Sequence, residues 1–230
     1  MRKTSELIDT LVESATPVRR LAPPLWRTCI WLALAALILA LLCVVHGVRP
    51  DLSMRLRQPV FVVSMFGALA TAVLAALASF KLNLPESPRR WLLLPLPGFA
   101  VWVSTIGYGC LTDWVSMSPD GIRMGEAARC FATLLMTSVP LSVVMLIMLR
   151  YAAPLRPTMV STVGGLAVAA MTSFALSLLH SLDATIMILI WNLGMAALIA
   201  GMASALGRPM LAWAAGRVMP LLPPQLSKPQ

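Results

Sequence analysis

Six long apolar runs constrain this sequence more than any other feature. They cover approximately 28–48, 59–80, 91–111, 130–149, 158–179 and 184–206. A helix needs about 20 mostly apolar residues to cross the hydrocarbon of a bilayer. The chain is 59% apolar and only 12% charged, unlike the mixture found in a soluble domain. We therefore predict an all-α integral membrane protein, folded as a six-helix transmembrane bundle with short loops.

The distribution of basic residues predicts the orientation of this bundle. The chain has 18 Lys and Arg residues and a net charge of +9. Cytoplasmic loops of membrane proteins concentrate Lys and Arg. With the N-terminus inside, only five of the 18 basic residues lie outside: Arg49, Arg55, Arg57, Arg123 and Arg129. We therefore expect both termini in the cytoplasm, and we attribute the positive charge to this rule rather than to direct nucleic-acid binding.

The apolar runs lack the polar groups that transport and catalysis usually need. Ion-coupled transporters place Asp, Glu or Lys within the hydrocarbon depth, and none lies inside these runs. The chain has two histidines and no CxxC, HExxH or glycine-rich phosphate-binding motif. The amide in mid-span, Asn192, suits a hydrogen bond between helices. These features argue against a transporter, and we do not expect an enzyme.

Small residues and prolines inside the runs predict how the helices pack. Small residues recur at four-residue spacing, which lets helices approach closely in lipid, as in Gly67, Thr71, Ala75 and Ser79. Pro95, Pro97 and Pro140 remove backbone donors and should bend the third and fourth helices. A homo-oligomer is kept as an alternative to a monomeric bundle.

A cluster of reactive side chains is expected at the outer face. Cys110 ends the third run, Cys130 opens the fourth, and His180 closes the fifth, so the topology places them at similar depth. Three interpretations stay open. The two thiols can form a disulfide in an oxidising compartment, the thiols and the imidazole can hold a soft metal ion such as zinc or copper, or the residues carry no chemistry.

A short amphipathic segment precedes the first run. In TSELIDTLVES, the helical spacing places Leu7, Ile8, Leu11 and Val12 on one face. The opposite face carries the polar residues Glu6, Asp9, Thr10 and Glu13. An isolated helix of about ten residues is marginal in water. We therefore expect this helix to be ordered only when its apolar stripe is covered.

Another protein is the favoured cover for this stripe. A helix that lies on the membrane surface carries Lys and Arg on its polar face, whereas this one is acidic and is repelled by anionic lipid. The cytoplasmic loops at 81–90 and 150–157 are too short and polar to form a groove. We therefore divide the chain into a cytoplasmic partner-binding segment (1–25), a transmembrane bundle (26–208) and a partly disordered cytoplasmic tail (209–230).

The order of several short motifs resembles the NrsF family, the negative regulators of sigma F. These are LIDTL, then PVRRLAPPLWR at the first run, ALASF and RRWLLLP around the second loop, GYGCLTDW, APLRP, and LH followed by IWNLG. No single motif is diagnostic, but their order extends over approximately residues 5–215. Members of this family are six-span anti-sigma factors of the bacterial inner membrane.

The resemblance implies a function and a set of site residues. The N-terminal segment would hold an extracytoplasmic-function sigma factor inactive through Leu7, Ile8, Leu11 and Val12, with the contact extended by Val18, Arg19, Arg20 and Leu21. An outside redox or metal stress would release it. Members of the family are associated with outward-facing cysteines, and Cys130 stands at one such position.

This sequence departs from the family pattern in one place. The loop after the fifth run reads His180-Ser181, where the family leads us to expect a histidine followed by a cysteine. Cys130 therefore has no disulfide partner in that loop. If thiol sensing is kept, Cys110 must pair with Cys130, or a metal must use the thiols with His180. The alternative function is a small transporter or metal-handling membrane protein that uses Cys110, Cys130 and His180.

Overall fold

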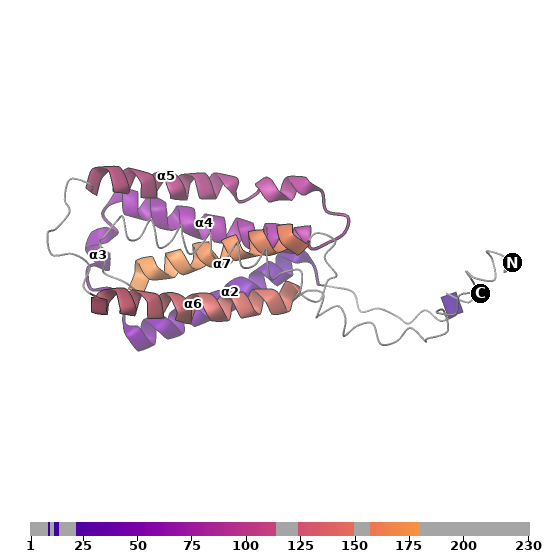
Figure 1. Ribbon diagram of the computed structural model, residues 1–230, viewed down its shortest axis with the longest axis horizontal. Coiled ribbons are helices and arrows are strands. Elements are labelled where there is room, and N and C mark those ends of the chain that lie inside the picture. Colours follow the sequence, from indigo (N-terminus) through magenta and orange to yellow (C-terminus); the bar gives the residue numbers. More distant parts are fainter. Residues whose placement is uncertain (1–8, 10–11, 14–21, 114–123, 150–156, 180–230) are drawn as a thin grey trace.

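The computed structural model describes residues 9, 12–13, 22–113, 124–149 and 157–179, and all the regular structure in this part of the chain is helical. The elements are α2 (Pro24–His46), α3 (Leu52–Arg55), α4 (Pro59–Leu82), the 3₁₀ helix η1 (Arg89–Leu93), α5 (Leu96–Asp113), α6 (Met124–Leu149) and α7 (Pro157–Leu179). The long helices run side by side as a bundle (Figure 1). The all-α prediction is confirmed for the described residues.

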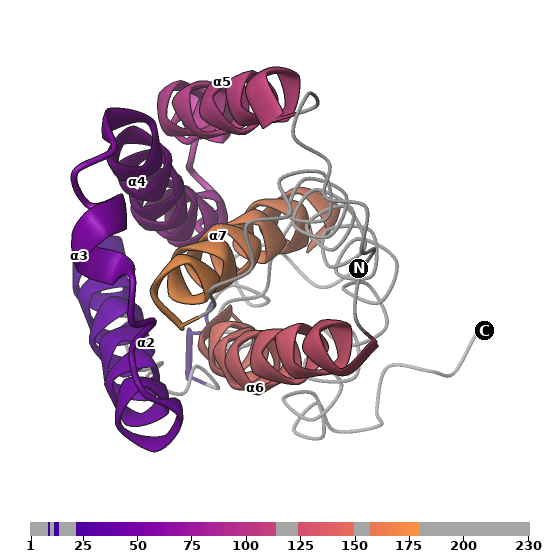
Figure 2. The same ribbon diagram turned by 90° about the vertical axis from the view of Figure 1, so that its left-hand side faces the viewer.

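Helix α7 lies at the centre of the described bundle. It packs against α4, α6 and α2, while α5 packs on the outside of α4 (Figure 2). Of the apolar window in α7, 67% is buried, against 22% for α2 and 33% for α4. The remaining surface of α2, α4 and α6 exposes large aliphatic side chains, which suits contact with lipid tails.

Four of the described helices are long and apolar enough to cross a membrane, by length and composition. They are Pro24–His46, Pro59–Leu82, Ala132–Leu149 and Thr158–Leu179. They correspond to four of the six predicted runs, at 28–48, 59–80, 130–149 and 158–179. The sixth run, 184–206, with Asn192, lies outside the described residues.

The third run is interrupted where the sequence places its prolines. The chain forms η1 and then a turn at Leu94 and Pro95. Helix α5 begins at Leu96 rather than at the predicted residue 91. Proline disfavours helical conformation in the residue before it, and it fits a helix without the loss of a backbone hydrogen bond only in the first turn. Pro97, the second residue of α5, meets that condition. In α6, by contrast, the helix continues through Pro140.

Helix α2 begins four residues before the predicted run. Pro24 is its first residue, where a missing backbone N–H costs nothing. Thr28 then donates a hydrogen bond from Oγ1 to the carbonyl of Pro24 at 2.8 Å. The helix therefore includes Trp26 and Arg27, which the sequence places before the first span. The predicted boundary between residues 25 and 26 falls within this first turn.

Small residues set the spacing of the central helices, as their pattern predicts. A Cβ on Gly67 would lie 3.0 Å from the backbone nitrogen of Trp102, and one on Gly98 would lie 2.9 Å from that of Thr71. Helices α4 and α5 therefore touch backbone to backbone at two levels. Ser79 of α4 donates from Oγ to the carbonyl of Val160 in α7 at 3.1 Å.

Candidate functional site

Arg27 joins three helices at the end of the bundle where the N-terminal segment enters. We call this the linker end: α2 and α7 begin there, and α4 and α6 finish there (Figure 1). The Arg27 side chain is only 6% exposed. Its Nη2 donates a hydrogen bond to the backbone carbonyl of Met148 in α6. Its guanidinium carbon lies 4.8 Å from the centroid of the Phe80 ring in α4, a cation–π distance.

A second buried side chain caps the same helix terminus. Asn83, at the end of α4, donates from Nδ2 to the carbonyl of Leu149 at 3.0 Å. The last carbonyls of an α-helix have no partner within the helix. Arg27 and Asn83 supply donors for two of them, Met148 and Leu149. The end of α6 is therefore tied to both α2 and α4.

Part of the predicted sigma-binding segment is described. Asp9, Val12 and Glu13 are helical and exposed, and the Val12 side chain is 69% exposed. No part of the described chain covers it. The other predicted contact residues lie outside the described residues: Leu7, Ile8, Leu11, Val18, Arg19, Arg20 and Leu21.

The opposite end of the bundle gathers the helix ends that carry the predicted sensor residues. Helix α5 ends at Asp113, α6 begins at Met124, and α7 ends at Leu179, all at this end (Figure 1). Cys110 and Cys130 belong to the helical backbone of α5 and α6, but their side chains lie outside the description, as does His180 altogether. Among the described residues, no group of three or more potential metal ligands is present.

An ion pair between buried Arg49 and half-exposed Asp51 anchors the loop between α2 and α4 at this opposite end. Arg49 is 6% exposed. It donates to both carboxylate oxygens of Asp51, at 2.8 and 2.6 Å. Its backbone N–H donates to the carbonyl of Leu178, one of the last residues of α7, at 3.1 Å. The loop is therefore fixed to the segment that leads into His180.

The neighbouring arginines keep Asp51 in its ionised form. The hydrogen bond from Arg49 lowers the pKa of Asp51 from 3.8 to about 2, and Arg55, whose Nε lies 3.6 Å from Asp51 Oδ2, acts in the same direction. Asp51 therefore stays ionised across the physiological range.

Sequence reasoning missed Arg27, Asn83 and Arg49 as structural residues. It assigned Arg27 and Arg49 only to the count of loop charges, and it gave Asn83 no role. The sequence did give a weak indication that Arg27 belongs to the first helix, because it lies within one turn of Pro23-Pro24, where the helix begins. No sequence signal indicates that its partner is a carbonyl 121 residues further along the chain.

Comparison with known proteins gives one match. The family model NrsF, described as negative regulator of sigma F, matches residues 11–213. The search of curated proteins and the search of solved structures each find no match.

Proposed function

This chain belongs to the NrsF family of negative regulators of sigma F, and on that basis we propose that it is a membrane-bound anti-sigma factor. Its partner is a sigma factor of the extracytoplasmic-function class, held at the bacterial inner membrane by the segment 1–25. The described helices, four of which are long and apolar enough to span a bilayer, support the role of the bundle as an anchor.

The exposure of Val12 is the observation that best supports the proposed docking site. An aliphatic side chain that is 69% exposed on a helical segment is available to a partner. With Leu7, Ile8 and Leu11 on the same face, docking would bury four aliphatic side chains. At about 1.5 to 3 kcal/mol each, this gives roughly 6 to 12 kcal/mol before the cost of ordering the segment. That is sufficient for a reversible complex, which Val18, Arg19, Arg20 and Leu21 extend.

We place signal detection at the end of the bundle opposite the linker end, which faces outward when both termini are cytoplasmic. Cys110, Cys130 and His180 follow or belong to helix ends that share one end of the bundle, and this supports a common redox or soft-metal site. Either chemistry, a Cys110–Cys130 disulfide or a thiol and imidazole metal site, would change the packing of α5 and α6 there.

Helix α6 offers a direct mechanical connection between the two ends. Cys130 lies in its first two turns, and Met148, which accepts the hydrogen bond from Arg27, lies in its last turn. A displacement of α6 along its axis therefore acts on the start of α2, next to the linker of the sigma-binding segment. Both termini are cytoplasmic in this scheme, so the segment meets the sigma factor on the same side as the linker end.

Transcription from a sigma-dependent promoter tests the proposal in cells. The parent chain represses the reporter, and the Leu7→Asp, Leu11→Asp variant releases it while remaining in the membrane fraction. Thr10→Asp, which adds a charge to the polar face one position from Leu11, leaves repression intact. Full repression by the double variant would contradict the docking site. Full repression after deletion of residues 1–20 would favour the metal-handling alternative.

A further inference from the structure

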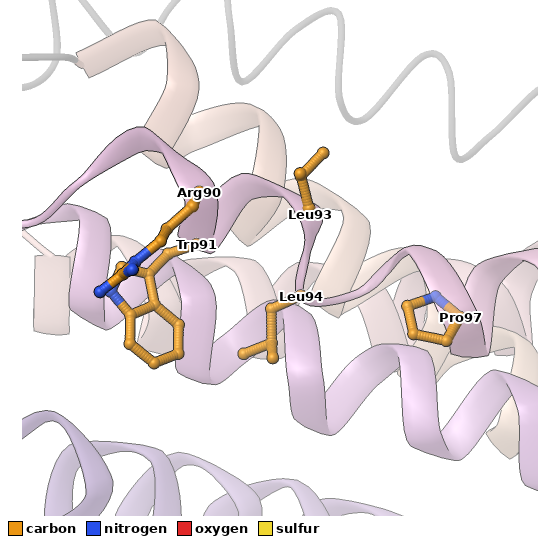
Figure 3. Close-up of a pocket in the computed structure, with 5 residues that line it drawn as sticks. All are labelled: Arg90, Trp91, Leu93, Leu94 and Pro97. Carbon is orange, nitrogen blue, oxygen red and sulfur yellow. The ribbon is translucent and has the colours of Figure 1, made fainter.

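A shallow groove lies where the chain passes from η1 into α5. It has a volume of about 430 Å³ and is lined by Arg90, Trp91, Leu93, Leu94 and Pro97. Figure 3 shows these five side chains spread along η1 and the start of α5. The groove exists because Pro95 and Pro97 interrupt the helix, so that the backbone changes course between Leu93 and Leu96.

The groove lies at the boundary between the apolar bundle and water. The apolar helix α4 ends at Leu82, and α5 begins at Leu96, so η1 occupies the interfacial level between them. Trp91 is half-buried, as is typical of indole rings at a membrane surface. Leu93 is 61% exposed and Leu96 is 50% exposed, which leaves an aliphatic surface directly beside the groove.

The polar side of the groove is cationic. The Lys81 ammonium lies 3.8 Å from the centroid of the Trp91 ring. Arg89 and Arg90 are both exposed, and neither forms an ion pair with another described residue. Residues 81–97 contain these three cations and a single carboxylate, that of Glu86. The groove thus combines the exposed Arg90 guanidinium with an apolar wall.

We propose that this groove binds a phospholipid with an anionic head group. The Arg90 guanidinium, which lines the groove, binds the phosphate through its planar pair of N–H donors, and the preceding exposed residue, Arg89, adds positive charge at the membrane boundary. One acyl chain lies against Leu93, Leu94 and Pro97. Basic groups at the membrane boundary favour anionic lipids, and the aliphatic wall favours a lipid over a soluble phosphate. The groove contains none of the residues that we propose to bind the sigma factor.

Native mass spectrometry of the purified full-length chain tests this site. The probes are phosphatidylglycerol and phosphatidylcholine with identical acyl chains, and we expect the parent to retain phosphatidylglycerol preferentially. Arg90→Gln should reduce that preference about 5-fold, and Arg89→Gln with Arg90→Gln about 25-fold, since each basic group near the surface contributes about a factor of five. Arg57→Gln is the matched control: Arg57 is also exposed but lies at the other end of the bundle, and its removal should change nothing.

The second arm separates a lipid site from a phosphate site. Glycerol phosphate, the soluble head-group fragment, should not displace phosphatidylglycerol, and Leu93→Ser should weaken retention of the lipid. The proposal is overturned if phosphatidylcholine is retained equally, if the Arg90→Gln and double variants keep the parent's preference, or if glycerol phosphate competes at concentrations equal to those of the lipid. An unchanged melting temperature in phosphatidylcholine shows that the variants are folded.

Discussion

The guanidinium of Arg27 donates a hydrogen bond to the backbone carbonyl of Met148, which joins the first residues of α2 to the last turn of α6. Arg27 is buried and its contact with Met148 is partly buried, and it lies three residues after the start of the helix that follows the N-terminal segment. A charged donor that caps a helix terminus is stronger than a neutral hydrogen bond. Arg27 therefore connects the bundle to the start of the helix that follows the N-terminal segment, where we propose that the sigma factor docks.

Removal of this contact should destabilise the bundle. We expect Arg27→Met to lower the free energy of unfolding by about 1.5 to 3 kcal/mol, because it leaves the Met148 carbonyl without its charged donor. Denaturation of the purified protein in mild detergent measures the change. Arg57→Met, at an exposed position, should stay within about 0.5 kcal/mol of the parent. Equal effects of the two substitutions would show that the Arg27 contact contributes nothing specific.

The close approach of α4 and α5 predicts different tolerance at two glycines of one helix. A Cβ at Gly98 would lie 2.9 Å from the Thr71 backbone nitrogen, whereas nothing lies within 4 Å of a Cβ at Gly107. Gly98→Ala should therefore cost about 1 to 3 kcal/mol through displacement of the backbones. Gly107→Ala should be neutral or slightly stabilising, since alanine favours the helix. The same denaturation experiment compares them, and a neutral Gly98→Ala would refute the observed packing.

The Arg49–Asp51 pair predicts a defined pH dependence. The pKa of Asp51 is lowered to about 2 in the folded chain from 3.8, so its contribution to stability is complete above the higher value and is lost as the pH falls toward the lower one. The difference in melting temperature between the parent and Asp51→Asn should be constant from about pH 7 to 5 and should shrink from about pH 4 to 2. A constant difference down to pH 2 would mean that Asp51 is not paired.

If Cys130 is part of a sensor, its substitution should affect the stress response differently from the substitution of another thiol of the bundle. Cys130→Ser should alter the dose of oxidant or cadmium that releases sigma-dependent transcription, because it removes a thiol from the end of the bundle where we propose that the signal is detected. Cys29→Ser is the matched control, since Cys29 is a free thiol exposed on α2 at the linker end. Identical dose responses of Cys130→Ser and the parent would remove Cys130 from the sensing mechanism.

The helices were predictable from the sequence because apolar length alone determines them in a membrane protein. The ends of α4 and α7 fall within two residues of the predicted runs. Prolines account for two of the differences, because they start α2 early and delay α5 to Leu96, whereas α6 begins at Met124, six residues before the predicted run, without a proline there. Proline at the first turn and proline in the interior have opposite effects, and hydropathy does not distinguish them.

The contacts that tie the bundle ends together were not predictable, because the bonds of Arg27 to Met148, Asn83 to Leu149 and Arg49 to Leu178 join residues far apart in the chain. Asn83 and the Leu149 carbonyl are 66 positions apart, and the partner atom is a backbone group that every residue has. The family match supports the sigma-factor role independently of these contacts. The sensor residues Cys110, Cys130 and His180 remain predictions, whose helix ends the fold brings to one end of the bundle.

Co-purification of the sigma factor with the full-length chain from membranes tests the central claim most directly. The parent and Thr10→Asp should each retain one sigma factor, and the Leu11→Asp and Leu7→Asp, Leu11→Asp variants should lose it, because they place charge on the face that Val12 shares. Equal retention by all four proteins would contradict the proposed docking face. Absence of a sigma factor from the parent preparation would contradict the anti-sigma function itself.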